Sequence, residues 1–172
     1  MADYSQAHLT NQEREILIAL RRIIRATDFS SKEIGEATGL ATSQVLVLQL
    51  LEAEGPLTAG RLANELLFSK STITAVLDGL EERKLIRRMR DERDRRSVIV
   101  SLTDSGREVL ASAPMPLQAQ LLLRFRALPD WERSWLLAAL QRVCHLLGAT
   151  KIEASPVLDV GAIGPGTKPE RS

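Results

Sequence analysis

The sequence predicts a mainly α-helical protein with one small β-hairpin. Aromatic residues make up only 3% of the 172 residues while leucine and alanine abound, so the core must consist chiefly of aliphatic side chains on helices. Apolar residues recur at helical spacing over most of the chain up to Gly148. Only the segments 85–90 and 97–102 have the composition and period of strands, and a charged turn separates them.

The composition also bounds the class of protein. No apolar run reaches the roughly 18 residues needed to cross a bilayer, and the polar segment 1–10 does not resemble a secretory signal. The single cysteine, Cys144, cannot form an internal disulfide, which is typical of a reducing compartment. We therefore expect a soluble, cytoplasmic protein with no membrane partner.

A long first helix is predicted from Thr10 to about Gly39. Thr10 and Glu13 have the spacing of a capping box, in which both side chains satisfy exposed backbone amides. The apolar face of this helix either joins the core of its own chain or also packs across a dimer, and we favour the second interpretation. Its apolar positions are Ile16, Leu17, Leu20, Ile23, Ile24 and Ile34.

Three shorter helices are predicted in the next forty residues or so. The first of them carries Val45, Leu46, Leu48 and Leu51 and ends at Gly55-Pro56, where glycine can cap and proline prevents continuation. Thr58 and Ser69 can cap the other two. The last has one apolar stripe, made of Ile73, Val76, Leu77 and Leu80.

The predicted hairpin is strongly basic. The chain as a whole has a net charge of +1, yet residues 83–96 hold eight arginines and lysines against three acidic residues. Three helices followed by a basic hairpin are the arrangement of a winged helix-turn-helix, in which the recognition helix enters the major groove and the wing reaches the neighbouring minor groove.

The rest of the chain is predicted to be helical, followed by an extended tail. A helix opens at Thr103, Pro114 and Pro116 interrupt it, and a last helix begins at Pro129-Asp130. We accordingly divide the chain into an N-terminal dimerisation helix (1–40), a winged helix-turn-helix domain (41–102), C-terminal dimerisation helices (103–150) and the tail (151–172).

Candidate DNA-binding residues lie at two places. Short polar side chains occupy the start of the fourth helix and the face away from its apolar stripe, where they either contact DNA or merely cap the helix and cover a solvated surface. At the hairpin tip Arg93, Arg95 and Arg96 suit a narrow, negative minor groove, and Asp94 would hold one of them in position. The candidates in the helix are Ser69, Lys70, Ser71, Thr72 and Thr74.

These motifs resemble the MarR family of bacterial regulators. The similarity lies in residues 57–66 (LTAGRLANEL), 69–88 (SKSTITAVLDGLEERKLIRR) and 91–106 (DERDRRSVIVSLTDSG). The resemblance implies a homodimer, formed by the first and last helices, that binds a pseudo-palindromic double-stranded DNA operator and usually represses transcription. It also implies a minor-groove contact for Arg96, a salt bridge from Asp94 and a phosphate contact for Arg95. Residues 20–29 and 152–159 further resemble repressors of ectoine and other compatible-solute genes.

The resemblance also suggests how the protein senses a signal. Many members bind small, often aromatic acids between the dimer helices and the winged domain, and Arg21, Arg22 and Arg25 could face such a crevice. Long arginines on a helix are nevertheless more often solvated. Other members sense oxidants through a cysteine; here we expect Cys144 to be a buried structural thiol, with a redox bond between subunits as the alternative.

Other classes of function find less support in the sequence. No nucleophile with a positioned base, metal-ligand set or phosphate-binding glycine loop is evident, so we expect neither an enzyme nor a cofactor. The only histidines, His8 and His145, do not suggest a metal site. A winged-helix module that binds only protein is the main alternative, and steep salt dependence of DNA binding would distinguish the two.

Overall fold

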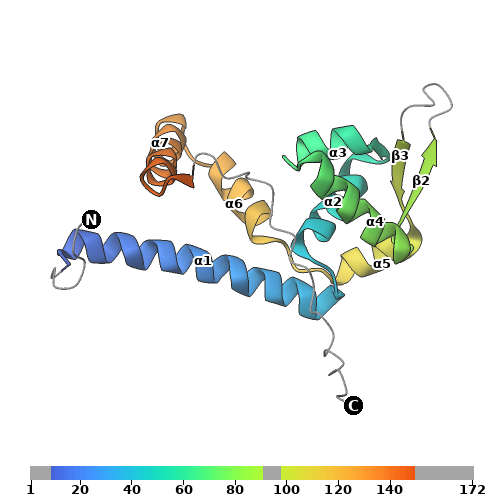
Figure 1. The fold of residues 1–172 in the computed structure, drawn as a ribbon, viewed down its shortest axis with the longest axis horizontal. Helices are drawn as coiled ribbons and strands as arrows, with labels where there is room; N and C mark the ends of the chain where they lie inside the picture. Colours follow the sequence, from blue (N-terminus) through green and yellow to red (C-terminus); the bar gives the residue numbers. More distant parts are fainter. Residues whose placement is uncertain (1–8, 91–97, 150–172) are drawn as a thin grey trace, which may run out of the picture.

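The computed structural model describes residues 9–90 and 98–149, which form a compact head and a set of projecting helices (Figure 1). The head contains α2 (Thr42–Glu54), α3 (Ala59–Glu65), α4 (Lys70–Glu82), α5 (Asp104–Ser112) and a small sheet. The 28-residue helix α1 (Asn11–Thr38) runs away from the head. Helix α6 (Leu117–Arg126) leads to α7 (Asp130–Leu146), which lies on the same side of the head as α1. The mainly helical fold predicted from the sequence is confirmed.

The sheet has one more strand than predicted. Strands β2 (Ile86–Arg90) and β3 (Val98–Leu102) form the expected antiparallel hairpin, and β1 (Leu57–Thr58) pairs with the other edge of β3. In this pairing Leu57 lies opposite Val100. A two-residue strand is too short to show a period of two, so only the tertiary structure reveals it. Its effect is to hold the start of α3 against the hairpin.

Polar side chains begin the helices where the sequence predicts. The Thr10–Glu13 capping box is present, and Thr58 and Ser69 accept hydrogen bonds from backbone amides at the starts of α3 and α4. The Thr10 backbone amide, and then its hydroxyl, donate to the Glu13 carboxylate and lower its pKa below the ordinary glutamate value. Helix α1 ends at Gly39, which takes the left-handed conformation expected of a capping glycine (φ 66°).

The hydrophobic core lies almost wholly in the head. Ile34, near the end of α1, is the only buried residue of that helix, and neither α6 nor α7 has a buried residue. The four residues of the α4 stripe are all buried, as predicted. They pack with apolar residues of α2, α3, the sheet and the turns on either side of α4, including Val45, Leu48, Leu51, Leu62, Phe68, Leu85, Ile86 and Val100.

No single helix in the described ranges is long and apolar enough to cross a membrane. Helices α1 and α2 satisfy the length and composition requirement only together, and the chain bends by 70° between them.

Gly106 provides a test of the packing between α5 and the hairpin. A Cβ atom at this position would lie 2.2 Å from the Leu85 carbonyl oxygen and 2.7 Å from Cδ1 of Leu102. Gly106→Ala should therefore lower the free energy of unfolding by about 1–3 kcal/mol, measured by chemical denaturation. Gly35→Ala in α1 is the control: no neighbouring atom lies within 4 Å, and helix propensity should raise stability by roughly 0.5–1 kcal/mol. Similar effects of the two substitutions would contradict this packing.

Candidate DNA-binding surface

Two tight turns set the position of α4 in the head. At the end of α3 the Phe68 amide donates to the Ala63 carbonyl and the Leu67 amide to that of Asn64. At the end of α4 the pattern is the same: the Leu85 amide donates to the Leu80 carbonyl, and the Lys84 amide donates to that of Glu81. Both are Schellman motifs, which require a left-handed residue just after the helix. Leu67 (φ 57°) and Lys84 (φ 60°) occupy these positions, where glycine is usual.

The start of α4 is held together by its own hydroxyl groups. The Ser69 hydroxyl accepts from the Thr72 amide at 3.1 Å and lies 2.8 Å from the hydroxyls of Ser71 and Thr72. Thr72 is 8% exposed. The interpretation that Thr72 faces outward is therefore wrong: it lies beside the buried stripe, and its hydroxyl pairs within the cap. Ser69 is half-buried and acts as the cap residue.

Three of the five helix candidates remain on the outer face of α4. Lys70, Ser71 and Thr74 are exposed, on the first turn or just after it. The Thr74 hydroxyl donates to the Lys70 carbonyl at 2.8 Å, which leaves its oxygen lone pairs and methyl group for an external partner. Close to a helix N-terminus, a cation and small hydroxyls are suited to phosphate oxygens and base edges.

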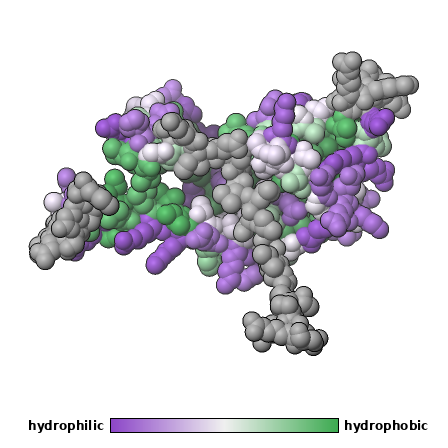
Figure 2. Space-filling view, in the orientation of Figure 1, coloured by the Kyte–Doolittle hydropathy of each residue, from purple (hydrophilic) through white to green (hydrophobic). Residues whose placement is uncertain are grey.

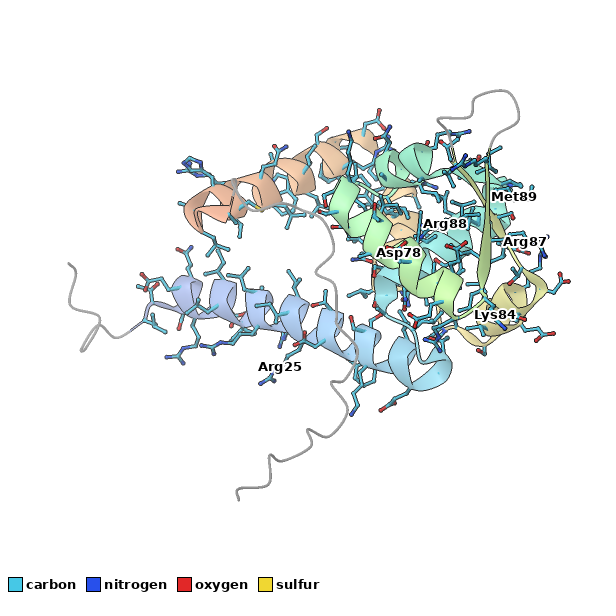
Figure 3. The ribbon with its side chains drawn as sticks, turned by 45° about the vertical axis from the view of Figure 1, so that its right-hand side comes forward. Arg25, Asp78, Lys84, Arg87, Arg88 and Met89 are labelled. Carbon is cyan, nitrogen blue, oxygen red and sulfur yellow. The ribbon has the colours of Figure 1, made fainter. Side chains whose placement is uncertain are left out.

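Arg88 on β2 joins the hairpin to α4, a role that the sequence interpretation missed. Its guanidinium makes ion pairs with Asp78 at 2.6 Å and Glu81 at 3.3 Å, and its side chain is only 24% exposed. Figure 3 shows Arg88 and Asp78 side by side between the strand and the helix. Because Arg88 offsets two carboxylates near the proposed DNA surface, it also reduces their repulsion of phosphate. The sequence did contain a signal for this contact. Asp78 and Glu81 are three residues apart on α4 and so lie on one face of the helix, and Arg88 occupies an inward-facing position of β2.

Two further arginines of β2 are exposed. Arg87 lies on the face of the strand opposite to Arg88, and Arg90 lies at the end of the strand. Figure 3 shows Arg87 and Met89 on β2. The predicted wing residues Arg93, Asp94, Arg95 and Arg96 lie outside the described residues, as does the predicted tail at 151–172. Their roles remain predictions.

The three arginines expected at an effector crevice lie on the surface of α1. Arg21, Arg22 and Arg25 are all exposed, and Figure 3 shows Arg25 on the side of α1 turned away from α7. A separate, open cavity of about 510 Å³ lies where the end of α1 meets the connection between α5 and α6. It is lined by Glu33, Glu36, Ala37, Ser112, Ala113 and Pro114.

Cys144 is exposed on α7, which corrects the prediction of a buried thiol. Leu146 and Leu147, which follow Cys144 closely in the sequence, are themselves 66% and 64% exposed, because α7 does not pack on a core formed by the described residues. In the ranges 9–90 and 98–149 no group of three or more histidine, cysteine or acidic residues is arranged to hold a metal ion.

Comparison with known proteins agrees with this architecture. The model of the MarR family matches residues 40–98, which run from the end of α1 to the start of β3. The regulator YkoM of Bacillus subtilis (strain 168) is 32% identical over 60% of this chain and 68% of its own. The repressor MdtR of the same organism is 32% identical over 56% of this chain, which spans 65% of the MdtR length. A solved structure of reduced AbfR bound to DNA is 26% identical, with a TM-score of 0.51, over 78% of this chain and 92% of that one.

The fold is that of winged-helix transcriptional regulators, and the relatives that the chain matches are transcriptional regulators. The chain belongs to the MarR family.

The Arg88 ion pairs can be tested by substitution. Arg88→Gln should lower the free energy of unfolding by about 0.5–1 kcal/mol, since the guanidinium is largely buried but the side chains of its partners, Asp78 and Glu81, are 60% and 44% exposed. Thermal unfolding at low and high salt measures this, and high salt should reduce the difference. Arg87→Gln is the control, because Arg87 is exposed on the other face of β2. Equal losses of stability in the two variants would contradict a stabilising role for the Arg88 ion pairs.

Proposed function

We propose that this protein acts as a homodimer that binds a pseudo-palindromic operator in double-stranded DNA and represses nearby genes or its own. One observation carries the proposal: the exposed start of α4 presents Lys70, Ser71 and Thr74 in the same head as a hairpin that exposes Arg87 and Arg90. A recognition helix with a wing is the known arrangement for contacting a major groove and the adjacent backbone or minor groove. DNA binding by the similar AbfR supports the same partner.

Dimer formation is supported by the apolar residues outside the head. On α7 Trp131, Trp135, Leu137 and Leu140 are between 53% and 71% exposed, and on α1 Ile23 and Ile24 exceed 50%. Figure 2 shows apolar side chains gathered in the region of α1 and α7. Such an extended apolar surface is rare on a monomer and marks an interface. We assign it to a second copy of this chain, related by a two-fold axis that would match two operator half-sites.

Relief of repression by a small molecule or a stress signal is part of the proposal. The arginines at 21, 22 and 25 are the predicted effector contacts, and control of ectoine or other compatible-solute genes is the more specific candidate. Both are tested by adding small aromatic acids, or raising osmolarity in the cell, and measuring operator occupancy. Occupancy unchanged by either treatment would remove these two refinements but leave DNA binding itself intact.

The dimer can be tested on α7. Leu140→Glu should weaken self-association about tenfold or more, because it places a charge in the proposed apolar interface. Sedimentation equilibrium measures the dissociation constant. Arg142→Glu, a neighbouring exposed position of the same helix, is the matched control and should change association less. A monomeric parent protein, or equal effects of both variants, would contradict the assignment.

The DNA contact can be tested at the wing. Arg96→Ala should weaken operator binding by about 1–3 kcal/mol and leave dimerisation unchanged. Titration of a duplex from the region flanking the gene, with a scrambled competitor and at two salt concentrations, measures affinity and selectivity. Affinity of the parent should fall steeply with salt because phosphate contacts release counterions. Absence of selective, salt-dependent binding would favour the module that binds only protein.

A further inference from the structure

Leu67 combines two features that are individually unfavourable. Its backbone is left-handed, with φ of 57°, a conformation that costs a leucine steric strain and costs glycine nothing. Its side chain is also 76% exposed, the most exposed of the large apolar residues of the described chain. A strained residue that also leaves an apolar group in water is a reason to look for a function.

The turn itself does not need this leucine. Phe68, the next residue, is 7% exposed and provides the apolar anchor that a Schellman motif places after the helix. The two backbone hydrogen bonds of the turn come from amide groups and would form equally well with glycine at 67. In the described part of the chain, the Leu67 side chain is therefore not required for the turn.

The position of Leu67 indicates what the side chain could contact. It lies two residues before the Ser69 cap, and the exposed Lys70 and Ser71 follow directly. In the proposed function this end of α4 enters the major groove. There thymine is the base that presents an apolar group, its C5 methyl, while the other base edges are polar.

We propose that Leu67 is a specificity-determining residue that packs on a thymine methyl group at the edge of each operator half-site. This inference rests on the proposed function, because it requires the start of α4 to lie on DNA. It adds a base preference outside α4 itself, contributed by the turn between the two helices of the motif.

Lys84 provides a matched control within the same molecule. It occupies the equivalent position of the second Schellman turn, has nearly the same φ of 60°, and is exposed, but it lies at the opposite end of α4. Figure 3 shows Lys84 at the base of the hairpin. Glycine at either position should relieve the same backbone strain, whereas only the substitution at 67 should remove an apolar contact with DNA.

The experiment compares Leu67→Gly, Leu67→Asn and Lys84→Gly with the parent. Asparagine tolerates the left-handed conformation but is polar, so it removes the apolar contact while retaining a side chain. Thermal unfolding measures the strain, and both glycine variants should melt higher by about 2–5 °C. Binding is measured on a duplex that the parent selects from a random pool, with each thymine replaced in turn by uracil, which lacks only the methyl group.

The parent should bind about fourfold more weakly when one particular thymine per half-site becomes uracil, the effect of burying one methyl group. Leu67→Gly and Leu67→Asn should lose that preference, whereas Lys84→Gly should keep it. The inference would be overturned, and the proposed function left standing, if both Leu67 variants kept the preference or if the parent showed no such thymine preference. Weaker dimerisation of the Leu67 variants by sedimentation would also overturn it. A parent that selects no duplex would instead refute the proposed function.

Discussion

Burial of the α4 stripe is the interaction on which the rest of the structure depends. Ile73, Val76, Leu77 and Leu80 each have less than 5% of their surface exposed. Once these four side chains face α2 and the sheet, the rotation of α4 about its axis is set, and the opposite face must be outermost. The polar start of the helix is consequently exposed because the opposite face of the same helix is buried in the core.

The surroundings of α4 convert that rotation into a defined position. The two Schellman turns end α3 and α4 with the same pattern of backbone hydrogen bonds. The strand β1 joins the start of α3 to β3. Arg88 then joins β2 to the exposed side of α4 through two carboxylates. These contacts tie α4 to the hairpin, as the proposed contact with two grooves of DNA requires.

The projecting helices differ from the head in how their apolar residues are buried. Their apolar residues have the correct helical period, yet in the single chain only Ile34 of α1 is buried and none of α6 or α7. Periodicity indicates that a face will be covered and does not say by which chain. The same reasoning explains Cys144: its position in an apolar stretch suggested burial, but α7 does not pack on a second surface among the described residues.

Local chemistry was sufficient to determine the helices, their caps, the α4 stripe and the β2–β3 hairpin, because each depends on residues close together in sequence. The tertiary structure alone decided which polar residues of α4 are available. Thr72 and Thr74 have the same side chain two positions apart, but one is buried beside the cap and the other is exposed. The tertiary structure likewise decided the strand β1, the Arg88 ion pairs and the left-handed turns at Leu67 and Lys84. These depend on packing between segments distant in sequence, or on backbone conformations that leucine and lysine do not favour by themselves.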